Sequence, residues 1–276
     1  MDTFPAVAIL GAGAMGGAIL SGLRAPGKVV DGGIRVTNRT EAKAAPLRGA
    51  GVTSFATESD PRANVAAVSG ARIVILGVKP AMVPDLLHEI ADALEPGTIV
   101  VSVAAGVTIA TMEAALPTSA AVLRAMPNTP AIVGRAVTGL SAGTRSTPDE
   151  LDLVRHLFET VGTVVVVPES KIDALSTISG SGPAYVFYLI EQLTATAVSM
   201  GFSDADATTL VNTTFLGASE LLAASGSSPG ELRRQVTSPK GTTERAVAEL
   251  EKADLKAIFD RATAAALARA RELSSG

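Results

Sequence analysis

Residues 8–20 read AILGAGAMGGAIL, with Gly11, Gly13 and Gly16 in the spacing G-x-G-x-x-G between a strand-like run and a helical pattern. The first glycine permits a tight turn, the second lets a pyrophosphate approach the backbone, and the third lets helix and strand pack closely. The stretch therefore predicts the first βα turn of a dinucleotide-binding domain rather than a Gly-rich turn without a ligand. The residues expected to line the cofactor here are Gly11, Ala12, Gly13, Ala14, Met15 and Gly16.

Up to residue 167, short β-branched runs alternate with helical patterns, which is typical of βαβ units and a parallel sheet. Thr147 followed by Pro148 is a typical N-cap with proline at the first helical position. Helices are expected at 15–24 and 148–160. Strands are expected at 6–10, 34–38, 72–78, 98–103, 121–126, 136–143 and 163–167.

After residue 168 the strand patterns stop, and long alanine-rich segments carry apolar residues at helical spacing. Helices are expected at 171–200, 204–225 and 254–275. We therefore predict an α/β protein with a Rossmann-type dinucleotide-binding domain at 1–167 and an all-α domain at 168–276. Small side chains make the helical half a poor isolated layer, so we expect a homodimer through this half.

Composition excludes several classes of protein. The 276 residues carry a formal net charge of −4, which argues against a nucleic-acid partner. No run approaches the roughly 20 apolar residues of a membrane span, and the N-terminus lacks a signal-peptide pattern. The absence of cysteine is compatible with a reducing compartment, so a cytoplasmic protein is expected. His88 and His156 are too few and too far apart to suggest a metal site.

The second expected strand ends in Asn38 and Arg39, where NAD-binding folds commonly carry an acidic residue for the ribose 2′-hydroxyl. Without that carboxylate, a 2′-phosphate is not repelled, and the guanidinium can bind it with paired donors. The sequence therefore favours NADPH, with NADH as a second possibility. The alternative for Arg39 is a solvated loop residue.

Two further strand ends lie at the same expected edge of the sheet, where ligands of open α/β sheets bind. Val78, Lys79 and Pro80 follow one strand; Lys79 is placed to touch phosphate or ribose unless it is a plain exposed lysine, and Pro80 would begin the next helix. Ala104 and Ala105 follow the next strand, and their small side chains allow the nicotinamide to approach the backbone.

Two Gly- and Pro-rich stretches complete the expected ligand-binding edge. Residues 124–134 read RAMPNTPAIVG, which holds Asn128 in a rigid turn between two prolines. Residues 176–187 read STISGSGPAYVF, whose glycines and Pro183 interrupt an otherwise helical pattern and should distort it. Such a break would expose amide groups beside Ser181; hydroxyls on an ordinary helix surface are the alternative.

The chain resembles the pyrroline-5-carboxylate reductase family. Six motifs carry the resemblance in order over nearly the whole chain: ILGAGAMG, VKP, VSVAAGV, RAMPNTPAIVG, SGSGPAYVF and VTSPKGTT. The resemblance implies an NADPH-dependent, sometimes NADH-using, enzyme of proline biosynthesis that transfers hydride to the C=N carbon of L-Δ1-pyrroline-5-carboxylate. It also implies homodimers with an interlaced helical half, which often assemble into larger rings.

The last motif opens residues 236–250, VTSPKGTTERAVAEL. Ser238 is expected to cap a helix that begins at Pro239, so that the helix dipole and free amides form a carboxylate cradle. The amides expected to point outward are those of Lys240, Gly241 and Thr242. Gly241 would let the ligand come close.

The resemblance also assigns roles to single residues. The threonine matching Thr243 contacts the ring nitrogen of the substrate, and the serine matching Ser238 helps to hold its carboxylate, so these two are the expected catalytic residues. Glu169 is expected near the substrate, with Ser181, Gly241 and Thr242. Asn64 is expected near the adenosine end of the cofactor. A protonated cyclic imine is already electrophilic, so Thr243 would act by positioning rather than as a strong acid.

The sequence departs from the family pattern at two places. Lys240 stands where the family usually has glycine, and Ser228 stands where it usually has histidine before proline. Lys240 could strengthen carboxylate capture or point to solvent, and we favour solvent. The rival functions are a β-hydroxyacid dehydrogenase or imine reductase, and a dinucleotide-binding protein without catalysis. Activity on related imines such as piperideine-2-carboxylate and feedback by proline stay open.

Overall fold

A computed structural model describes residues 2–275, which form two compact units. The helical unit comprises residues 182–265, and the described residues on either side of it form the sheet unit. The sheet unit continues past residue 167, where the sequence predicts the domain boundary. The reason is local packing: a Cβ atom at Gly139 of the sheet would lie only 2.7 Å from the side chain of Leu175.

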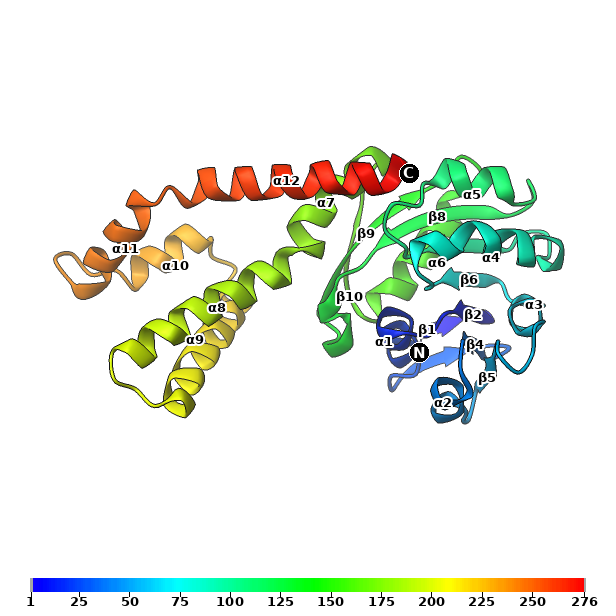
Figure 1. The fold of residues 1–276 in the computed structure, drawn as a ribbon, viewed down its shortest axis with the longest axis horizontal. Coiled ribbons are helices and arrows are strands. Elements are labelled where there is room, and N and C mark those ends of the chain that lie inside the picture. Colours follow the sequence, from blue (N-terminus) through cyan, green and yellow to red (C-terminus); the bar gives the residue numbers. More distant parts are fainter. Residues whose placement is uncertain (1, 276) are drawn as a thin grey trace. The chain divides into compact units, whose positions relative to one another are not determined.

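Figure 1 shows the order of the elements. The strands are β1 (Asp2–Phe4), β2 (Val7–Leu10), β3 (Lys28–Val30), β4 (Ile34–Asn38), β5 (Val52–Ala56), β6 (Ile73–Leu76), β7 (Ile99–Ser102), β8 (Ala121–Met126), β9 (Ala136–Ala142) and β10 (Gly162–Val166). The α-helices are α1 (Ala14–Leu23), α2 (Glu41–Ala44), α3 (Ala63–Val68), α4 (Val83–Ile90), α5 (Ile109–Ala115), α6 (Pro148–Glu159), α7 (Ile172–Leu175), α8 (Gly182–Ser199), α9 (Asp204–Ser225), α10 (Pro229–Gln235), α11 (Thr242–Lys252) and α12 (Leu255–Ser275). Short 3-10 turns are η1 (Ala45–Leu47), η2 (Pro80–Met82), η3 (Ala91–Ala93), η4 (Thr129–Val133) and η5 (Glu169–Lys171), and η6 (Ser176–Gly180) is a π-helical turn.

The main sheet has eight strands in the order β10-β9-β8-β7-β6-β2-β4-β5. The chain moves outward from β2 in one direction through β4 and β5, and in the other through β6, β7 and β8. The strand order therefore reverses between β2 and β6, which is the switch point where open α/β sheets bind their ligands. This confirms the predicted Rossmann-type topology.

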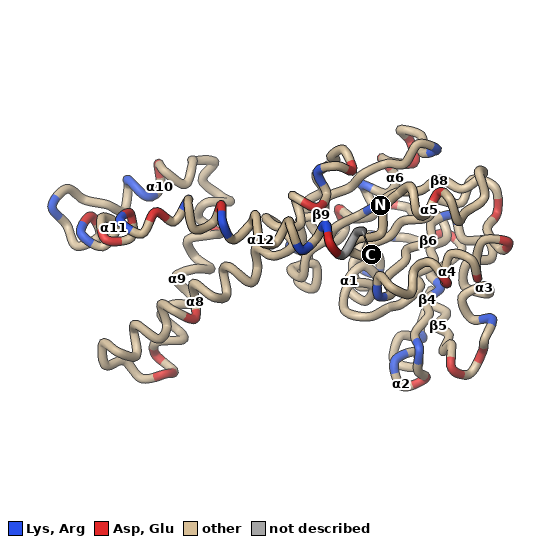
Figure 2. Tube along the Cα trace, turned by 45° about the horizontal axis from the view of Figure 1, so that its top comes forward, with Lys and Arg blue, Asp and Glu red and all other residues tan. Residues whose placement is uncertain are grey.

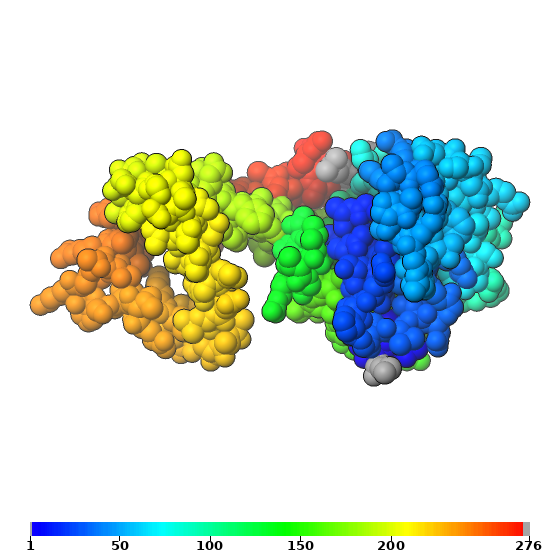
Figure 3. Space-filling model, turned by 90° about the horizontal axis from the view of Figure 1, so that it is seen from below, coloured from blue at the N-terminus to red at the C-terminus, as the bar shows by residue number. Residues whose placement is uncertain are grey.

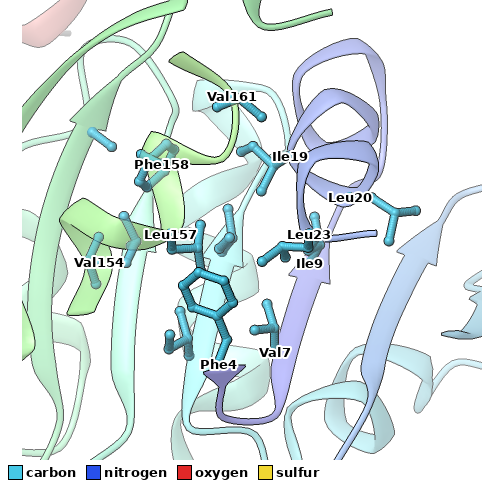
Figure 4. Packing of buried hydrophobic residues seen from close by; sticks show 14 of the residues in the cluster. Phe4, Val7, Ile9, Ile19, Leu20, Leu23, Val154, Leu157, Phe158 and Val161 are labelled. Atoms are coloured by element: carbon cyan, nitrogen blue, oxygen red, sulfur yellow. The ribbon is translucent and has the colours of Figure 1, made fainter. Parts of the chain in front are cut away.

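The two faces of the sheet carry separate hydrophobic cores. Val7 and Ile9 of β2 belong to a cluster with residues of α1 and α6, whereas Ala8 and Leu10 of the same strand belong to a cluster with residues of α3, α4 and α5. Figure 4 shows Phe4, Val7 and Ile9 packed against side chains of α1 and α6. A strand buried on both faces reads as a continuous apolar run, which explains VAIL and IVIL in the sequence.

The seven predicted strands are present within about two residues of their expected ends. The expectation of a wholly parallel sheet is wrong in one place, because β9 pairs antiparallel with β8 and β10 follows the direction of β9. Strands β1, β3 and β5 are not among the predicted strands. Two of them are three residues long and pair only with each other, and β5 is an edge strand with polar residues inside it.

The helical unit leaves many apolar side chains uncovered. Helix α8 has no buried residue, and α9 has only Ala207 and Val211. In Figure 2 charged residues are sparse along α8 and α9, and in Figure 3 the helices of this unit cover one another only partly. Among the described residues, no helix is both long and apolar enough to cross a membrane.

Candidate functional site

The glycine-rich turn lies at the switch point between β2 and β6. Gly11 has φ +92°, and a Cβ atom there would lie 2.9 Å from the carbonyl carbon of Gly77. A Cβ atom at Gly16 would lie 2.5 Å from the carbonyl oxygen of Gly11, whereas one at Gly13 would meet nothing within 4 Å. The first and third glycines are therefore needed by the fold itself. The second leaves an open space where a pyrophosphate would come close to the backbone.

The backbone holds this turn in place and leaves a helix terminus available. The amides of Gly11 and Ala12 donate to the carbonyl oxygen of Thr37 at 3.1 Å and 3.0 Å. Helix α1 then begins at Ala14, and Gly13 before it provides no side-chain cap. The uncapped first-turn amides and the positive end of the helix dipole suit an anion, so the residues fit the pyrophosphate of a dinucleotide.

Asn38 and Arg39 lie at the carboxyl end of β4, one strand away from the turn. The side chain of Asn38 is buried and its amide nitrogen has no partner, while the side chain of Arg39 is exposed. The neighbouring carboxylate of Glu58 accepts a hydrogen bond of 2.8 Å from the amide of Glu41, at the start of α2. The end of this strand thus presents the guanidinium of Arg39, which fits a ribose carrying a phosphate, while the amide nitrogen of Asn38 lies buried behind it in the chain.

The residues after β6 lie beside the glycine-rich turn. The Cγ1 atom of Val78 would be 3.0 Å from a Cβ atom at Gly11, so this side chain borders the turn directly. Lys79 is exposed, and Pro80 begins the turn η2 as the sequence predicts. These positions are consistent with a cofactor edge formed by Val78, Lys79 and Pro80.

The residues after β7 differ from each other. Ala104 is buried and its amide donates to the hydroxyl of Ser102 at 3.2 Å, whereas Ala105 is exposed. Ala105 therefore has the freer surface for a flat ring.

Asn64, expected at the adenosine end, lies on α3, and its amide donates to the carboxylate of Glu89 at 3.0 Å. A cofactor contact by Asn64 stays a prediction.

Asn128 is buried at the carboxyl end of β8 with both ends of its amide engaged. Its nitrogen donates to the carbonyl oxygen of Ser179 at 2.9 Å, and its oxygen accepts from the amide of Val137 at 2.9 Å. The expected distortion near Gly180 is also present, because residues 176–180 form a π-helical turn. The amide of Ser181 donates back to the carbonyl oxygen of Ser176 at 2.9 Å, so the break leaves that amide paired.

Glu169 takes part in a charged cluster that the sequence does not predict. Its Oε1 atom accepts a hydrogen bond of 2.7 Å from the amide of Ile109 and lies 3.5 Å from Nη1 of Arg124. Nη2 of Arg124 donates to Oδ1 of Asp173 at 2.8 Å. Arg124 was recognisable as a charged residue inside the apolar strand AVLRAM, because a buried charge needs a partner. Nothing in the sequence identified Glu169 and Asp173 as those partners.

In the helical unit, the expected structure of the tip at 236–243 is partly wrong. Helix α11 begins at Thr242 rather than at Pro239, with Gly241 as N-cap and no side-chain cap from Ser238. Lys240 takes φ +61°, which prevents the helix from starting earlier. The remaining uncapped donors are the first-turn amides of α11, beginning at Thr242.

Two amides expected to be free are bonded within the tip. The amide of Lys240 donates to the carboxylate of Glu244 at 2.9 Å, and the amide of Gly241 donates to the carbonyl oxygen of Ser238 at 3.0 Å. Thr243 is half-buried on the first turn of α11. Ser228, at the other departure from the family pattern, caps α10 in a capping box with Glu231.

The chain matches two family models. Residues 169–273 match the model for pyrroline-5-carboxylate reductase dimerisation, and residues 6–106 match that for NADP oxidoreductase, coenzyme F420-dependent. The first covers the segment from Glu169 into α12, and the second covers the glycine-rich turn and the strands around it. The two matches therefore fall on the predicted helical half and the predicted nucleotide half.

The similarity to single proteins covers nearly the whole chain. A pyrroline-5-carboxylate reductase of Corynebacterium melassecola is 38% identical, over 97% of this chain and 98% of its own, and one of Pseudomonas aeruginosa is 36% identical. A solved structure of a pyrroline-5-carboxylate reductase from Coxiella burnetii is 36% identical with a TM-score of 0.89, covering 97% of this chain and 98% of its own. The chain belongs to the pyrroline-5-carboxylate reductase family of oxidoreductases.

Proposed function

We propose that this chain reduces L-Δ1-pyrroline-5-carboxylate to L-proline, with NADPH preferred over NADH. The observation that carries the proposal is the glycine-rich turn at the switch point. The backbone at Gly11 lies so close to Gly77 that a Cβ atom would not fit, whereas a Cβ atom at Gly13 would meet nothing within 4 Å. This turn occurs in a chain that belongs to the pyrroline-5-carboxylate reductase family over nearly its whole length. The residues therefore support both halves of the reaction, namely a bound dinucleotide and a cyclic imine acid.

The preference for NADPH rests on the end of β4. The exposed guanidinium of Arg39 can bind a 2′-phosphate with paired donors, and the residue before it, Asn38, keeps an unpartnered amide nitrogen. No carboxylate stands at Asn38 or Arg39 to select an unphosphorylated ribose.

The substrate is an anion with a polar ring nitrogen, and the tip of the helical unit suits both features. The first-turn amides of α11 and the positive end of its dipole attract a carboxylate, and Ser238 adds a hydroxyl nearby. The protonated ring nitrogen would donate a hydrogen bond to the hydroxyl oxygen of Thr243. A reduced nicotinamide supplies hydride when bound, and the chain's own contribution is to hold the protonated ring in the reactive orientation.

We also propose that the chain acts as a homodimer, and that dimers assemble further into rings. The uncovered apolar side chains of α8 and α9 support the dimer, because an exposed surface of this kind marks an interaction site. The large exposed apolar residues of the two helices are Val186, Phe187, Tyr188, Leu189, Leu193, Val198, Leu210, Leu216, Leu221 and Leu222. A cytoplasmic location stays the expectation from the sequence.

The experiment measures NADPH oxidation with pyrroline-5-carboxylate, and compares 3-hydroxyisobutyrate oxidation with NADP⁺. We expect turnover only with the imine, which would separate this function from that of a β-hydroxyacid dehydrogenase and from dinucleotide binding without catalysis. Thr243→Ala should lower kcat about 10²-fold while NADPH affinity stays unchanged. Thr263→Ala, which removes a hydroxyl that donates to the carbonyl oxygen of Phe259 within α12, is the matched control. No turnover by the wild-type protein would contradict the function, and full turnover by Thr243→Ala would remove the proposed role of that hydroxyl.

A further inference from the structure

The buried arginine of the sheet unit has a position that the proposed chemistry does not use. Arg124 is the fourth residue of β8, and its side chain is only 3% exposed. Alternate strand residues share a face, so it lies on the same side as Val122, which packs in the cluster with α4 and α5. A guanidinium in such an apolar surface is costly unless carboxylates meet it.

The carboxylates that meet Arg124 come from the segment after β10. Asp173 belongs to α7 and accepts a hydrogen bond of 2.8 Å, and Glu169 lies 3.5 Å away in the turn before it. Glu169 also accepts from the amide of Ile109, the first residue of α5. Arg124 thus joins β8 to the starts of two helices, and we call these three charged residues the arginine clamp.

The segment held by the clamp leads directly into the π-helical turn. Helix α7 ends at Leu175, and η6 follows without interruption from Ser176 to Gly180. The far end of η6 is fixed by Asn128, which donates to the carbonyl oxygen of Ser179. A π-turn is rare in proteins and occurs frequently at functional sites. The clamp and Asn128 are therefore two anchors on either side of one distorted turn.

Both anchors connect η6 to the edge of the sheet that binds ligands. Asn128 follows the carboxyl end of β8, and β8 runs parallel to β7, β6 and β2, whose carboxyl ends form the nucleotide edge. Arg124 pairs in register with Ser102, the last residue of β7. A shift of α7 along the face of β9 would consequently move η6 relative to this edge.

We propose that Arg124 and Asp173 are positioning residues, which fix the π-turn η6 at the nucleotide edge and thereby set the geometry of hydride transfer. The inference rests on the proposed function. Neither residue contacts the substrate in this scheme. They act through the backbone of η6, so a loosened clamp lowers kcat more than it changes the affinity for cofactor or substrate, because misplacement by about 1 Å costs up to about 10²-fold in rate.

The test uses Asp173→Asn, which keeps the shape of the side chain and removes its charge, and Arg124→Lys, which keeps the charge but cannot hold two carboxylates as a fork. Arg145→Lys is the matched control, since Arg145 binds the carbonyl oxygens of Glu113, Leu116 and Pro117 at the other end of α5. Steady-state kinetics, NADPH affinity by fluorescence and hydrogen exchange of the full-length protein are measured for each.

We expect Asp173→Asn to lower kcat about 10-fold with KM and NADPH affinity within about twofold of wild type. Exchange in residues 172–181 should become faster without cofactor present, while exchange in 34–56 stays unchanged. Arg145→Lys should leave kcat and the exchange of 172–181 unchanged.

Three results would contradict the proposal that the arginine clamp positions η6. They are unchanged exchange in 172–181, faster exchange with unchanged kcat, and an equal loss of kcat in Arg145→Lys. An inactive wild-type protein would contradict the proposed function instead, and the exchange measurement would still show whether the clamp holds η6.

Discussion

The side-chain amide of Asn128 donates a hydrogen bond of 2.9 Å to the carbonyl oxygen of Ser179, which lies 51 residues later in the chain. The same side chain accepts a hydrogen bond of 2.9 Å from the amide of Val137. One buried amide therefore fixes the turn after β8, the start of β9 and the π-turn η6 together. The two flanking prolines keep the turn rigid, so the amide group is held where both partners can reach it.

Two substitutions of Asn128 distinguish the contributions of its two hydrogen bonds, because one removes both bonds and the other removes only the bond to Ser179. Asn128→Ala leaves both Val137 N–H and Ser179 C=O without this partner, so we expect the free energy of unfolding to fall by about 2–3 kcal/mol. Asn128→Asp still accepts from Val137 but no longer donates to Ser179, so it tests the bond to η6 alone. Urea unfolding and kcat are measured for both variants. Equal stability of Asn128→Ala and wild type would contradict the locking role.

In the glycine-rich turn, Gly16 is needed for folding, whereas Gly13 is expected to be needed only for cofactor binding. A methyl group at Gly16 would meet the carbonyl oxygen of Gly11 at 2.5 Å, so Gly16→Ala should destabilise the sheet unit and abolish cofactor binding. At Gly13 nothing lies within 4 Å, so Gly13→Ala should fold normally and still lose NADPH affinity, by about 10-fold or more. Thermal unfolding and a fluorescence titration with NADPH distinguish the two effects.

Gly17 provides the control for both substitutions. It lies inside α1, and a methyl group there would meet nothing within 4 Å. Gly17→Ala should raise the free energy of unfolding by about 0.5–1 kcal/mol, because alanine is the better helix former. If Gly13→Ala bound NADPH as well as Gly17→Ala does, the open space at Gly13 would not be the pyrophosphate site.

The sequence predicted what depends on local spacing. The glycine motif and the two-sided apolar strands identified the Rossmann topology, because close approach and burial leave a direct pattern in neighbouring residues. The capping box at Thr147 was predictable in the same way, and it is present. The sequence did not show contacts between distant residues, such as that of Arg124 with Asp173. It also did not show the left-handed backbone at Lys240, because a lysine does not favour that conformation.

Arg39 is expected to set the preference for NADPH over NADH, measured as the ratio of the two kcat/KM values. Arg39→Ala removes the guanidinium expected to bind the 2′-phosphate, so we expect kcat/KM for NADPH to fall about 10-fold while that for NADH changes by less than about twofold. Arg62→Ala removes another exposed arginine, at the N-cap of α3, and is the control. An unchanged ratio of the two kcat/KM values in Arg39→Ala would show that Arg39 is a solvated loop residue.

Glu150 gives the sheet unit a stability that depends on pH. Burial raises the pKa of Glu150, but hydrogen bonds from the amide of Thr147 at 2.9 Å and from Arg72 at 3.1 Å outweigh burial and hold it below its ordinary value of 4.5. Because the folded state binds the proton less readily than the unfolded state, the ionised carboxylate stabilises the fold above pH 4.5. This contribution is lost as the pH falls through the lowered pKa.

Glu150→Gln keeps the shape of the capping box and removes the titration. The free energy of unfolding of the variant should therefore fall less steeply than that of wild type between about pH 5 and about pH 3. Glu249→Gln, which changes an exposed partner of Lys252, should leave the slope unaltered. Identical slopes for wild type and Glu150→Gln in urea unfolding would show that Glu150 makes no such contribution.

Lys240 takes the left-handed conformation, with φ +61°, at the position where the family resemblance predicts glycine. A side chain with a Cβ atom is strained there by about 1–2 kcal/mol, and glycine is not. Lys240→Gly should therefore raise the free energy of unfolding by about 1 kcal/mol, after the greater freedom of glycine in the unfolded chain is subtracted.

Lys240→Ala separates the backbone effect from the effect of the ammonium group, since alanine keeps the Cβ atom and loses the charge. If the lysine points to solvent, both variants keep the KM for pyrroline-5-carboxylate within about twofold, and only Lys240→Gly becomes more stable. If the ammonium helps to capture the carboxylate, both variants raise KM together. A rise in stability of Lys240→Ala equal to that of Lys240→Gly would contradict the explanation from backbone strain.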